Sequence, residues 1–260
     1  MTTAPSAFDQ PAVVLRLRAA GCVFAEDEAR LLVEAAGTPA ELAAMVDRRV
    51  SGEPLEHLLG WVEFCGLRVA VGPGVFVPRR RTGFLVRQAA ALAAPGSVVV
   101  DLCCGSGAVG AAVAAAVDGI DLHVADVDPV AVAYARRNLA VAEVHEGDLF
   151  EALPTALRGR VDVLVANVPY VPSGAIALMP PEARDHEPRV ALDGGADGLD
   201  VVRRVAAGAP EWLAPGGSLL FESSASQAPH AVEVLAAVGL RPRVVGDEDL
   251  DATVVVGTLG

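Results

Sequence analysis

Four residues that follow an apolar run, Asn167-Val168-Pro169-Tyr170, combine groups that could hold a planar nitrogen. The nitrogen of an amide or of an exocyclic base amine is a poor nucleophile because its lone pair is delocalised. The Asn167 side-chain oxygen and a neighbouring backbone carbonyl could accept its two N–H hydrogens and aim the lone pair at an electrophile. Pro169 would stiffen this turn, and Tyr170 would offer a flat face to the acceptor. We therefore predict catalytic roles for Asn167, Pro169 and Tyr170, and acceptor binding by all four residues; alone, the run is equally typical of a strand-to-loop turn.

A second group of residues, from Val98 to Val117, reads as a strand, a glycine turn and a helix, which is where α/β folds bind ligands. The spacing would suit a nicotinamide dinucleotide, because Gly105-x-Gly107-x-x-Gly110 is followed about twenty residues later by an acid, Asp126. The acid that closes the strand, Asp101, favours another ligand, because D-L-x-x-G-S-G resembles the loop of S-adenosylmethionine-dependent methyltransferases.

A third acid supports the methyl donor. Asp148 follows the third strand, where class I methyltransferases keep a polar contact to the adenine amine. The adjacent Cys103 and Cys104 are interpreted as small residues packed at the turn, because neighbouring cysteines rarely reach disulfide geometry. The residues predicted to bind S-adenosylmethionine, and its product S-adenosylhomocysteine, are Asp101, Cys103, Cys104, Gly105, Ser106, Gly107, Asp126, Asp148, Leu149 and Asn167.

The rest of the chain supplies elements to position these residues. Apolar residues recur at helical spacing between Pro11 and Leu59, which predicts three short helices, with Thr38 as an N-cap. After 97, strands are expected at 98–102, 122–125, 141–145, 161–166, 218–222, 241–245 and 253–257, with helices between most of them. This alternation predicts an α/β fold with a mainly parallel seven-stranded sheet, an antiparallel edge hairpin and a small N-terminal helical domain. Together with the resemblance of the donor loop, it implies a Rossmann-like sheet of the class I methyltransferase type. The expected divisions are a helical domain over 1–60, a β-hairpin linker over 61–78 and a domain with the sheet over 79–260. The family resemblance given below implies that the first is a substrate-recognition domain and the last the catalytic domain.

The amino-acid composition excludes several kinds of chemistry and binding partner. The 260 residues carry a net charge of −13 and, since every basic residue is Arg, no lysine could form a Schiff base. The acidity argues against broad binding to nucleic acid or anionic membranes. The four cysteines form no C-x-x-C pair, so neither a disulfide framework nor a metal site is expected. Because the start lacks a signal peptide pattern, we expect a cytoplasmic protein. We also expect it to be a monomer.

The motifs together resemble one family, the HemK-type protein-(glutamine-N5) methyltransferases of peptide chain release factors, which carry Asn-Pro-Pro-Tyr at 167–170. The resemblance covers nearly the whole chain, with further similarity at 49–60, 63–67 and 77–79. The segments Glu-Pro-Arg at 187–189 and Gly-Gly-Ala-Asp-Gly-Leu at 194–199 are the most specific. It implies that 103–107, Asp126 and Asp148-Leu149 hold the donor, and that 167–170 bind a glutamine amide. It also implies that the acceptor is a protein, with the Gly-Gly-Gln loop of a release factor as the candidate.

The chain departs from the family pattern in three places. Val168 replaces a Pro, which removes one conformational restraint. Cys103-Cys104 replaces Gly-Thr, a change that other methyltransferases tolerate. The run Arg-Arg-Thr-Gly at 80–83 replaces a Pro-Glu-Thr-Glu-like stretch of the family, and the resulting arginine cluster at 79–81 could be a solvated face. These departures are typical of a divergent member or paralogue.

Three alternative functions stay open at this point. A clamp of this kind also serves methylation of adenine or guanine in nucleic acids, although the negative charge argues against it. The chain could bind the donor and dock to a partner protein without catalysis, an alternative raised by Val168. The third alternative is a nicotinamide oxidoreductase. It would need a set of residues that act on the substrate exchanging hydride with the cofactor, and the sequence shows no such set.

Overall fold

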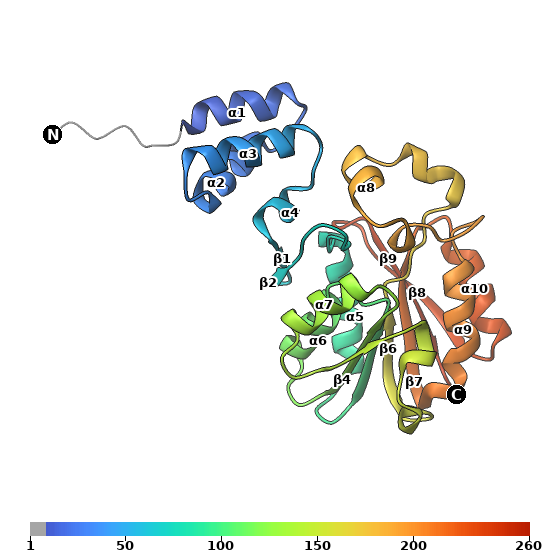
Figure 1. The fold of residues 1–260 in the computed structure, drawn as a ribbon. Coiled ribbons are helices and arrows are strands. Elements are labelled where there is room, and N and C mark those ends of the chain that lie inside the picture. Colours follow the sequence, from blue (N-terminus) through green and yellow to red (C-terminus); the bar gives the residue numbers. More distant parts are fainter. Residues whose placement is uncertain (1–8) are drawn as a thin grey trace.

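A seven-stranded sheet forms the centre of the molecule in the computed structural model, which describes residues 9–260 (Figure 1). The strands lie in the order β5-β4-β3-β6-β7-β9-β8. Their bounds are β3 Val98–Leu102, β4 Asp121–Asp126, β5 Glu143–Glu146, β6 Val161–Ala166, β7 Leu213–Ser223, β8 Arg241–Asp247 and β9 Ala252–Thr258. The first five strands of this order pair in parallel, and β9 runs antiparallel to β7 and β8. The predicted class I sheet with its antiparallel hairpin is confirmed.

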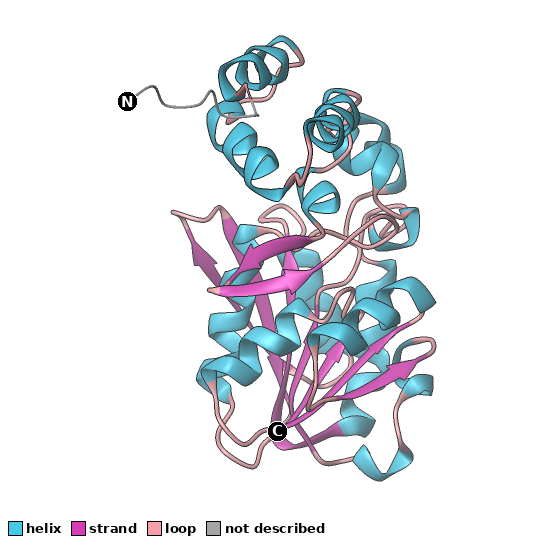
Figure 2. Ribbon diagram, turned by 60° about the vertical axis from the view of Figure 1, so that its left-hand side comes forward, coloured by secondary structure: helices cyan, strands magenta, loops and turns pink. Residues whose placement is uncertain are grey.

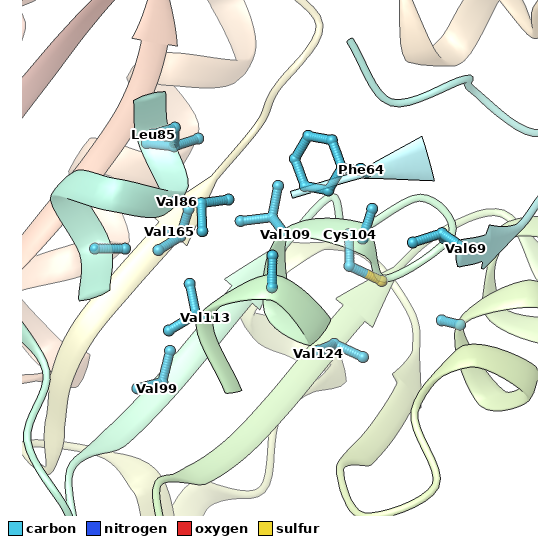
Figure 3. Close-up of a cluster of buried hydrophobic side chains, with 14 of the residues drawn as sticks. Phe64, Val69, Leu85, Val86, Val99, Cys104, Val109, Val113, Val124 and Val165 are labelled. Carbon is cyan, nitrogen blue, oxygen red and sulfur yellow. The ribbon is translucent and has the colours of Figure 1, made fainter. Parts of the chain in front are cut away.

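Helices cover both faces of the sheet (Figure 2). One face carries α5 Gly83–Leu92, α6 Ala108–Ala116 and α7 Pro129–Asn138, and the other carries α9 Asp200–Trp212 and α10 Ala228–Ala237. Because both faces are covered, β3 is buried along its whole length. Val99, Val124 and Val165 pack under α5 and α6 (Figure 3), whereas Val100 and Leu164 pack on the opposite side.

The N-terminal helices have a separate core. They are α1 Gln10–Ala19, α2 Ala25–Ala35, α3 Pro39–Val50 and the short α4 Leu55–Leu59, and Figure 1 shows α1 to α3 standing apart from the sheet. Leu17, Leu32 and Val46 are buried between them. The three predicted helices are present, and the Thr38 hydroxyl caps α3 by accepting from the Glu41 N–H at 3.1 Å. Helix α4 was not predicted, because five residues are too few to show a helical period.

A hairpin, β1 Trp61–Phe64 and β2 Leu67–Ala70, joins these helices to the sheet. Its buried side chains Phe64 and Val69 pack into the same cluster as Val109 (Figure 3). The division into a recognition domain, a linker and a catalytic domain at 60 and 78 stays a prediction.

One strand differs from its predicted position. The strand expected at 141–145 is β5 at Glu143–Glu146, because Val141 lies on the surface with 92% exposure and pairing starts opposite His123. The prediction placed the apolar Val141 in the strand, whereas the edge strand itself is mostly polar. Within residues 9–260, no helix has the length and apolar character needed to cross a membrane.

Candidate active site

A cavity of about 200 Å³ opens at the carboxyl ends of β3, β4 and β6. Its wall contains every residue predicted to bind donor or acceptor except Gly107, so the two predicted groups meet in one place. Parallel strands place their carboxyl ends on the same edge of a sheet, which is why residues far apart in sequence converge here.

Asp101, at the end of β3, is fully buried in the cavity wall. Its Oδ2 accepts the Gly110 N–H at 2.9 Å, and Oδ1 has no hydrogen-bond partner within residues 9–260. Burial raises the pKa of this carboxyl to about 7, against the lowering effect of the Gly110 N–H. An unpaired buried carboxylate oxygen is costly, so it is ready to accept a hydrogen bond from a cationic ligand.

Asp126, at the end of β4, ties two loops together. Its Oδ2 accepts the Gly105 N–H at 2.8 Å, and its Oδ1 accepts the Asp128 N–H at 2.9 Å. Burial raises its pKa, and these backbone donors oppose the rise. A carboxylate has about four acceptor positions, so Asp126 keeps capacity for ribose hydroxyls.

Gly107 in the loop and Gly110 in α6 permit close approach of the backbone to neighbouring side chains. A Cβ at Gly110 would lie 3.0 Å from Val124 and 3.3 Å from Asp101, so only glycine lets α6 approach near enough for its N–H to reach Asp101. Gly107 has φ +77° and faces Leu139, away from the cavity wall. We therefore expect Gly107 to shape the loop rather than to touch a ligand.

Two non-glycine residues adopt left-handed backbone in this wall, Cys103 at φ +55° and Leu149 at φ +50°. Such strain concentrates at functional sites. The Asp148 carboxylate, beside Leu149, accepts from the Arg204 guanidinium at 2.6 Å, a partner that the sequence did not indicate. Burial raises the pKa of both Cys103 and Cys104, so these thiols stay protonated and are poor nucleophiles.

The acceptor segment follows β6. Within residues 9–260, neither the Asn167 side chain nor the Val168 carbonyl takes part in a hydrogen bond, and both residues line the cavity. The Val168 side chain is 2% exposed and packs in the core under α9. Val168 therefore fills with apolar volume the position where the family pattern has proline, and leaves its carbonyl available.

The Tyr170 hydroxyl is held by a buried acid. It donates to the Glu222 carboxylate at 2.8 Å, and the same carboxylate accepts from Arg81 at 2.7 Å and from the Thr82 hydroxyl at 2.7 Å. Arg81 also donates to the Tyr170 hydroxyl itself. Burial raises the pKa of Tyr170, and the Glu222 charge adds to the rise, so the phenol stays protonated. This network fixes the ring that forms one side of the acceptor position.

The glycine-rich segment at 194–199 packs against the back of this loop. The Gly194 N–H donates to the Val171 carbonyl at 2.8 Å, and a Cβ at Gly194 would lie 2.7 Å from the Pro169 carbonyl oxygen. A Cβ at Gly198, where φ is +80°, would lie 2.3 Å from the Tyr170 carbonyl oxygen. Gln227 donates from Nε2 to that same carbonyl at 2.9 Å.

Comparisons with known proteins agree with this geometry. Residues 67–179 match the family described as "Methyltransferase small domain". The release factor glutamine methyltransferase of Geobacter sulfurreducens is 39% identical over 208 residues, which are 77% of this chain and 72% of that protein. The chain belongs to the release factor glutamine methyltransferase family. The protein of the same name from Bifidobacterium longum is 35% identical over 261 residues, covering 92% of this chain and 88% of its own length.

A solved methyltransferase from Pyrococcus furiosus shares the fold at TM-score 0.57 and 16% identity, over 75% of this chain and 90% of its own. Membership of the release factor glutamine methyltransferase family makes the protein an S-adenosylmethionine-dependent methyltransferase, so the predicted enzyme class and methyl donor are confirmed. The roles of the individual site residues stay predictions, now with their geometry defined.

The family signature Glu-Pro-Arg at 187–189 has a structural partner in the arginine cluster. The Glu187 carboxylate accepts from Arg79 at 2.7 Å through both oxygens and from the Val77 N–H at 3.1 Å. Arg79 and Arg81 thus both pair with buried acids, whereas Arg80 is exposed and forms no ion pair within residues 9–260. Sequence reasoning missed the roles of Arg81, Glu222, Arg204 and Gln227. The positive run at 79–81 could have led to Arg81, and no local signal pointed to the other three.

Proposed function

We propose that this protein transfers a methyl group from S-adenosylmethionine to the side-chain nitrogen of a glutamine in a peptide chain release factor. The observation that carries the proposal is the pair of unengaged acceptor atoms in the cavity wall, the Asn167 side-chain oxygen and the Val168 carbonyl. They lie in one cavity with Asp101 and Asp126, and relatives that span most of this chain are named release factor glutamine methyltransferases.

The residues present fit the donor. Asp101 has a buried, unpaired carboxylate oxygen that suits a cationic amino acid portion, and Asp126 and Asp148 keep carboxylate oxygens for hydroxyls and an exocyclic amine. Residues Asp101, Cys103 to Ser106, Asp126 and Asp148-Leu149 would hold it, while Asn167 would stand between donor and acceptor. When bound, S-adenosylmethionine supplies an electrophilic methyl carbon attached to a sulfonium.

The chain contributes positioning. Asn167 and the Val168 carbonyl would accept the two amide N–H hydrogens and fix the glutamine nitrogen, and Tyr170, held by Glu222 and Arg81, would lie against the amide plane. The glutamine nitrogen held by Asn167 and the Val168 carbonyl would take the methyl group as the donor releases it with loss of its sulfonium charge, and the nitrogen would then lose a proton to solvent. Strong bases are not required, because the nitrogen becomes acidic once it is methylated.

The proposal also covers substrate recognition, cellular location and partners. We expect residues 1–60 to recognise the protein substrate, the chain to act as a cytoplasmic monomer, and neither membrane nor a specific nucleic acid sequence to be a partner. The net charge of −13 supports the last expectation, since phosphate backbones repel such a surface.

Radiolabelled S-adenosylmethionine would test the proposal, incubated with this protein and purified release factors that carry a Gly-Gly-Gln loop. Label should appear on the intact release factor and not on one whose loop glutamine is replaced by alanine. Asn167→Ala should lower kcat/KM by the equivalent of about 2–4 kcal/mol, as for loss of one transition-state hydrogen bond. A melting temperature close to that of the parent protein serves as the control for folding of this variant. Label on another protein would keep the chemistry and change the substrate, whereas label only in nucleic acid would sink the glutamine assignment.

A further inference from the structure

Three metal-ligating side chains converge at the edge of the sheet, outside the cavity described above. His123 lies on β4, and Glu143 and His145 lie on the edge strand β5. The parallel register pairs His123 with Glu143 and Ala125 with His145, so the three side chains share one face of the sheet. One potential ligand atom from each residue lies within 4.8 Å of the others.

The two imidazoles already have a spacing that suits a shared ion. His123 Nδ1 and His145 Nε2 are 3.1 Å apart, and the rings are stacked at 14°. In a tetrahedral zinc site with bonds of about 2.0–2.1 Å, neighbouring ligand atoms are about 3.3 Å apart. Small side-chain adjustments would therefore place both nitrogens on one ion, with the exposed Glu143 carboxylate as third ligand and water as fourth.

A second observation concerns the orientation of His123, which is buried at 6% exposure. Its Nε2 lies 3.4 Å from the Asp121 carboxylate. A carboxylate beside one imidazole nitrogen favours the proton there and leaves the other nitrogen as a lone-pair donor, the arrangement found behind metal-binding histidines. Here the nitrogen without a proton is Nδ1, which faces Nε2 of His145.

We propose that His123, Glu143 and His145 bind one divalent transition-metal ion of the zinc type, with Asp121 orienting His123. Imidazole and carboxylate ligands suit such ions. The ion would link β5 to β4, its one neighbour in the sheet. Asp126 and Asp148 stand three residues beyond His123 and His145, so the ion would stabilise the strand pair that carries these cavity residues. Single-sequence reasoning did not find this group because its members are split between two strands.

Isothermal titration with Zn²⁺ would test the site, on the full untagged chain with Cys22→Ser and Cys65→Ser to remove the more accessible thiols. The expected result is one equivalent of Zn²⁺ bound, and a rise in melting temperature with Zn²⁺. Glu143→Gln and His145→Gln, at partly exposed positions, should weaken binding at least tenfold and abolish the rise. Asp121→Asn should weaken binding about tenfold, as expected for a residue that orients a ligand.

The matched control is His230→Ala, which removes an exposed histidine on α10 and should leave Zn²⁺ binding unchanged. His123→Ala could lose binding through misfolding, so the more exposed variants decide. The absence of stoichiometric Zn²⁺ binding by the parent chain would overturn the proposal. So would binding that Glu143→Gln and His145→Gln leave intact, because the ion would then sit elsewhere. The readout needs no methylation activity, so its failure is separate from failure of the proposed function.

Discussion

The donor half and the acceptor half of the cavity are built in different ways. In the donor half, carboxylates at strand ends accept backbone N–H groups from nearby sequence, as Asp126 does from Gly105 and Asp101 does from Gly110. In the acceptor half, Tyr170 is held by a side chain 52 residues further on, Glu222, and by one 89 residues earlier, Arg81. The donor half therefore depends mainly on backbone from nearby sequence, with the Arg204–Asp148 pair as its long-range side-chain contact, whereas the acceptor half depends on long-range side-chain contacts throughout.

This difference has a physical consequence. A site made from backbone donors tolerates side-chain changes that keep the loop in place, whereas a charged network in a buried position is disrupted by loss of any one member. The two halves should consequently be separable by substitution, with donor affinity and methyl transfer responding independently. Four substitutions test that separation, from the largest expected effect to the smallest.

Gly198→Ala should damage the acceptor half most. The new methyl group would lie 2.3 Å from the Tyr170 carbonyl oxygen and 2.2 Å from Gln227 Nε2, so the acceptor loop must move. A displacement of about 1 Å can cost about 10²-fold in rate. We expect such a loss in kcat/KM for methyl transfer, and a Kd for S-adenosylhomocysteine within about twofold of the parent value, since no donor residue is displaced.

The matched control for this prediction is Gly239→Ala. Gly239 has φ +83°, nearly the same backbone strain, but nothing lies within 4 Å of an added Cβ. Gly239→Ala should lose stability by about the cost of a left-handed alanine, about 1 kcal/mol, and Gly198→Ala should lose more because its methyl group also meets the Tyr170 carbonyl. Equal losses of activity in the two variants would show that strain, rather than contact with the Tyr170 loop, is responsible.

Arg81→Ala should have the next largest effect. It removes the cation from Glu222, whose side chain is only 4% exposed, while Arg81 itself is 46% exposed. Because the pair is half solvated, we expect a loss of about 1–3 kcal/mol in unfolding free energy, below the range for fully buried pairs. We expect roughly a tenfold lower kcat/KM, equivalent to about 1.4 kcal/mol. Arg81→Lys should recover part of both, since it keeps the charge but not the planar fork.

Arg80→Ala is the control, because Arg80 is the exposed neighbour in the same cluster. Chemical denaturation and initial methylation rates would be measured for all three variants. If Arg80→Ala and Arg81→Ala behave alike, the cluster acts through its overall charge and the specific contact with Glu222 is unimportant.

The donor half could be predicted from the sequence, whereas the contacts of the acceptor half could not. Strands 98–102 and 161–166 and the donor loop were predicted correctly, because strand, glycine turn and acid lie together in the chain. Arg81 was left open as a solvated face, since nothing local indicates that it meets a side chain 141 residues away. Glu222 was predicted only as a strand residue. Burial of that carboxylate, and hence its need for Arg81 and Thr82, is a property of the tertiary structure alone.

The donor half can be tested through the pH dependence of donor affinity, which we attribute to Asp101. Burial raises its pKa to about 7, and only the ionised carboxylate attracts a cationic donor. Donor affinity should therefore increase about fivefold between about pH 6 and pH 7, following the ionised fraction. In Asp101→Asn the affinity should be weaker and nearly independent of pH over this range, as measured by titration with S-adenosylmethionine.

The effect on stability has the opposite sign. The pKa in the folded state lies above its usual value, so between about pH 4 and pH 7 the folded state binds more protons at Asp101 than the unfolded state does. Unfolding free energy should fall as pH rises through this window, and Asp101→Asn should remove that part of the dependence. A donor affinity that is as steep in Asp101→Asn as in the parent would assign the titration to another group.

The smallest effect is expected where the acceptor half meets the N-terminal helices. Arg49 of α3 pairs with Glu28 of α2 at 2.6 Å and with Glu182 of α8 (Pro181–His186) at 2.6 Å. Helix α8 belongs to the segment between the acceptor loop and Gly194, and it lies at the same end of the sheet as the N-terminal helices (Figure 1). Because the Glu182 side chain is 49% exposed, Glu182→Gln should cost at most about 1 kcal/mol in unfolding free energy.

The informative readout for Glu182→Gln is therefore the KM for the protein substrate. We expect a rise of about twofold, the equivalent of a few tenths of a kcal/mol, with kcat and donor Kd unchanged. Asp185→Asn, an exposed change on the same helix, is the control. An unchanged KM would mean that Glu28 alone keeps Arg49 in place and that the helices act on the acceptor half through packing around α4 instead. A raised donor Kd would contradict the separation itself, because it would make the N-terminal helices a support for the donor loop.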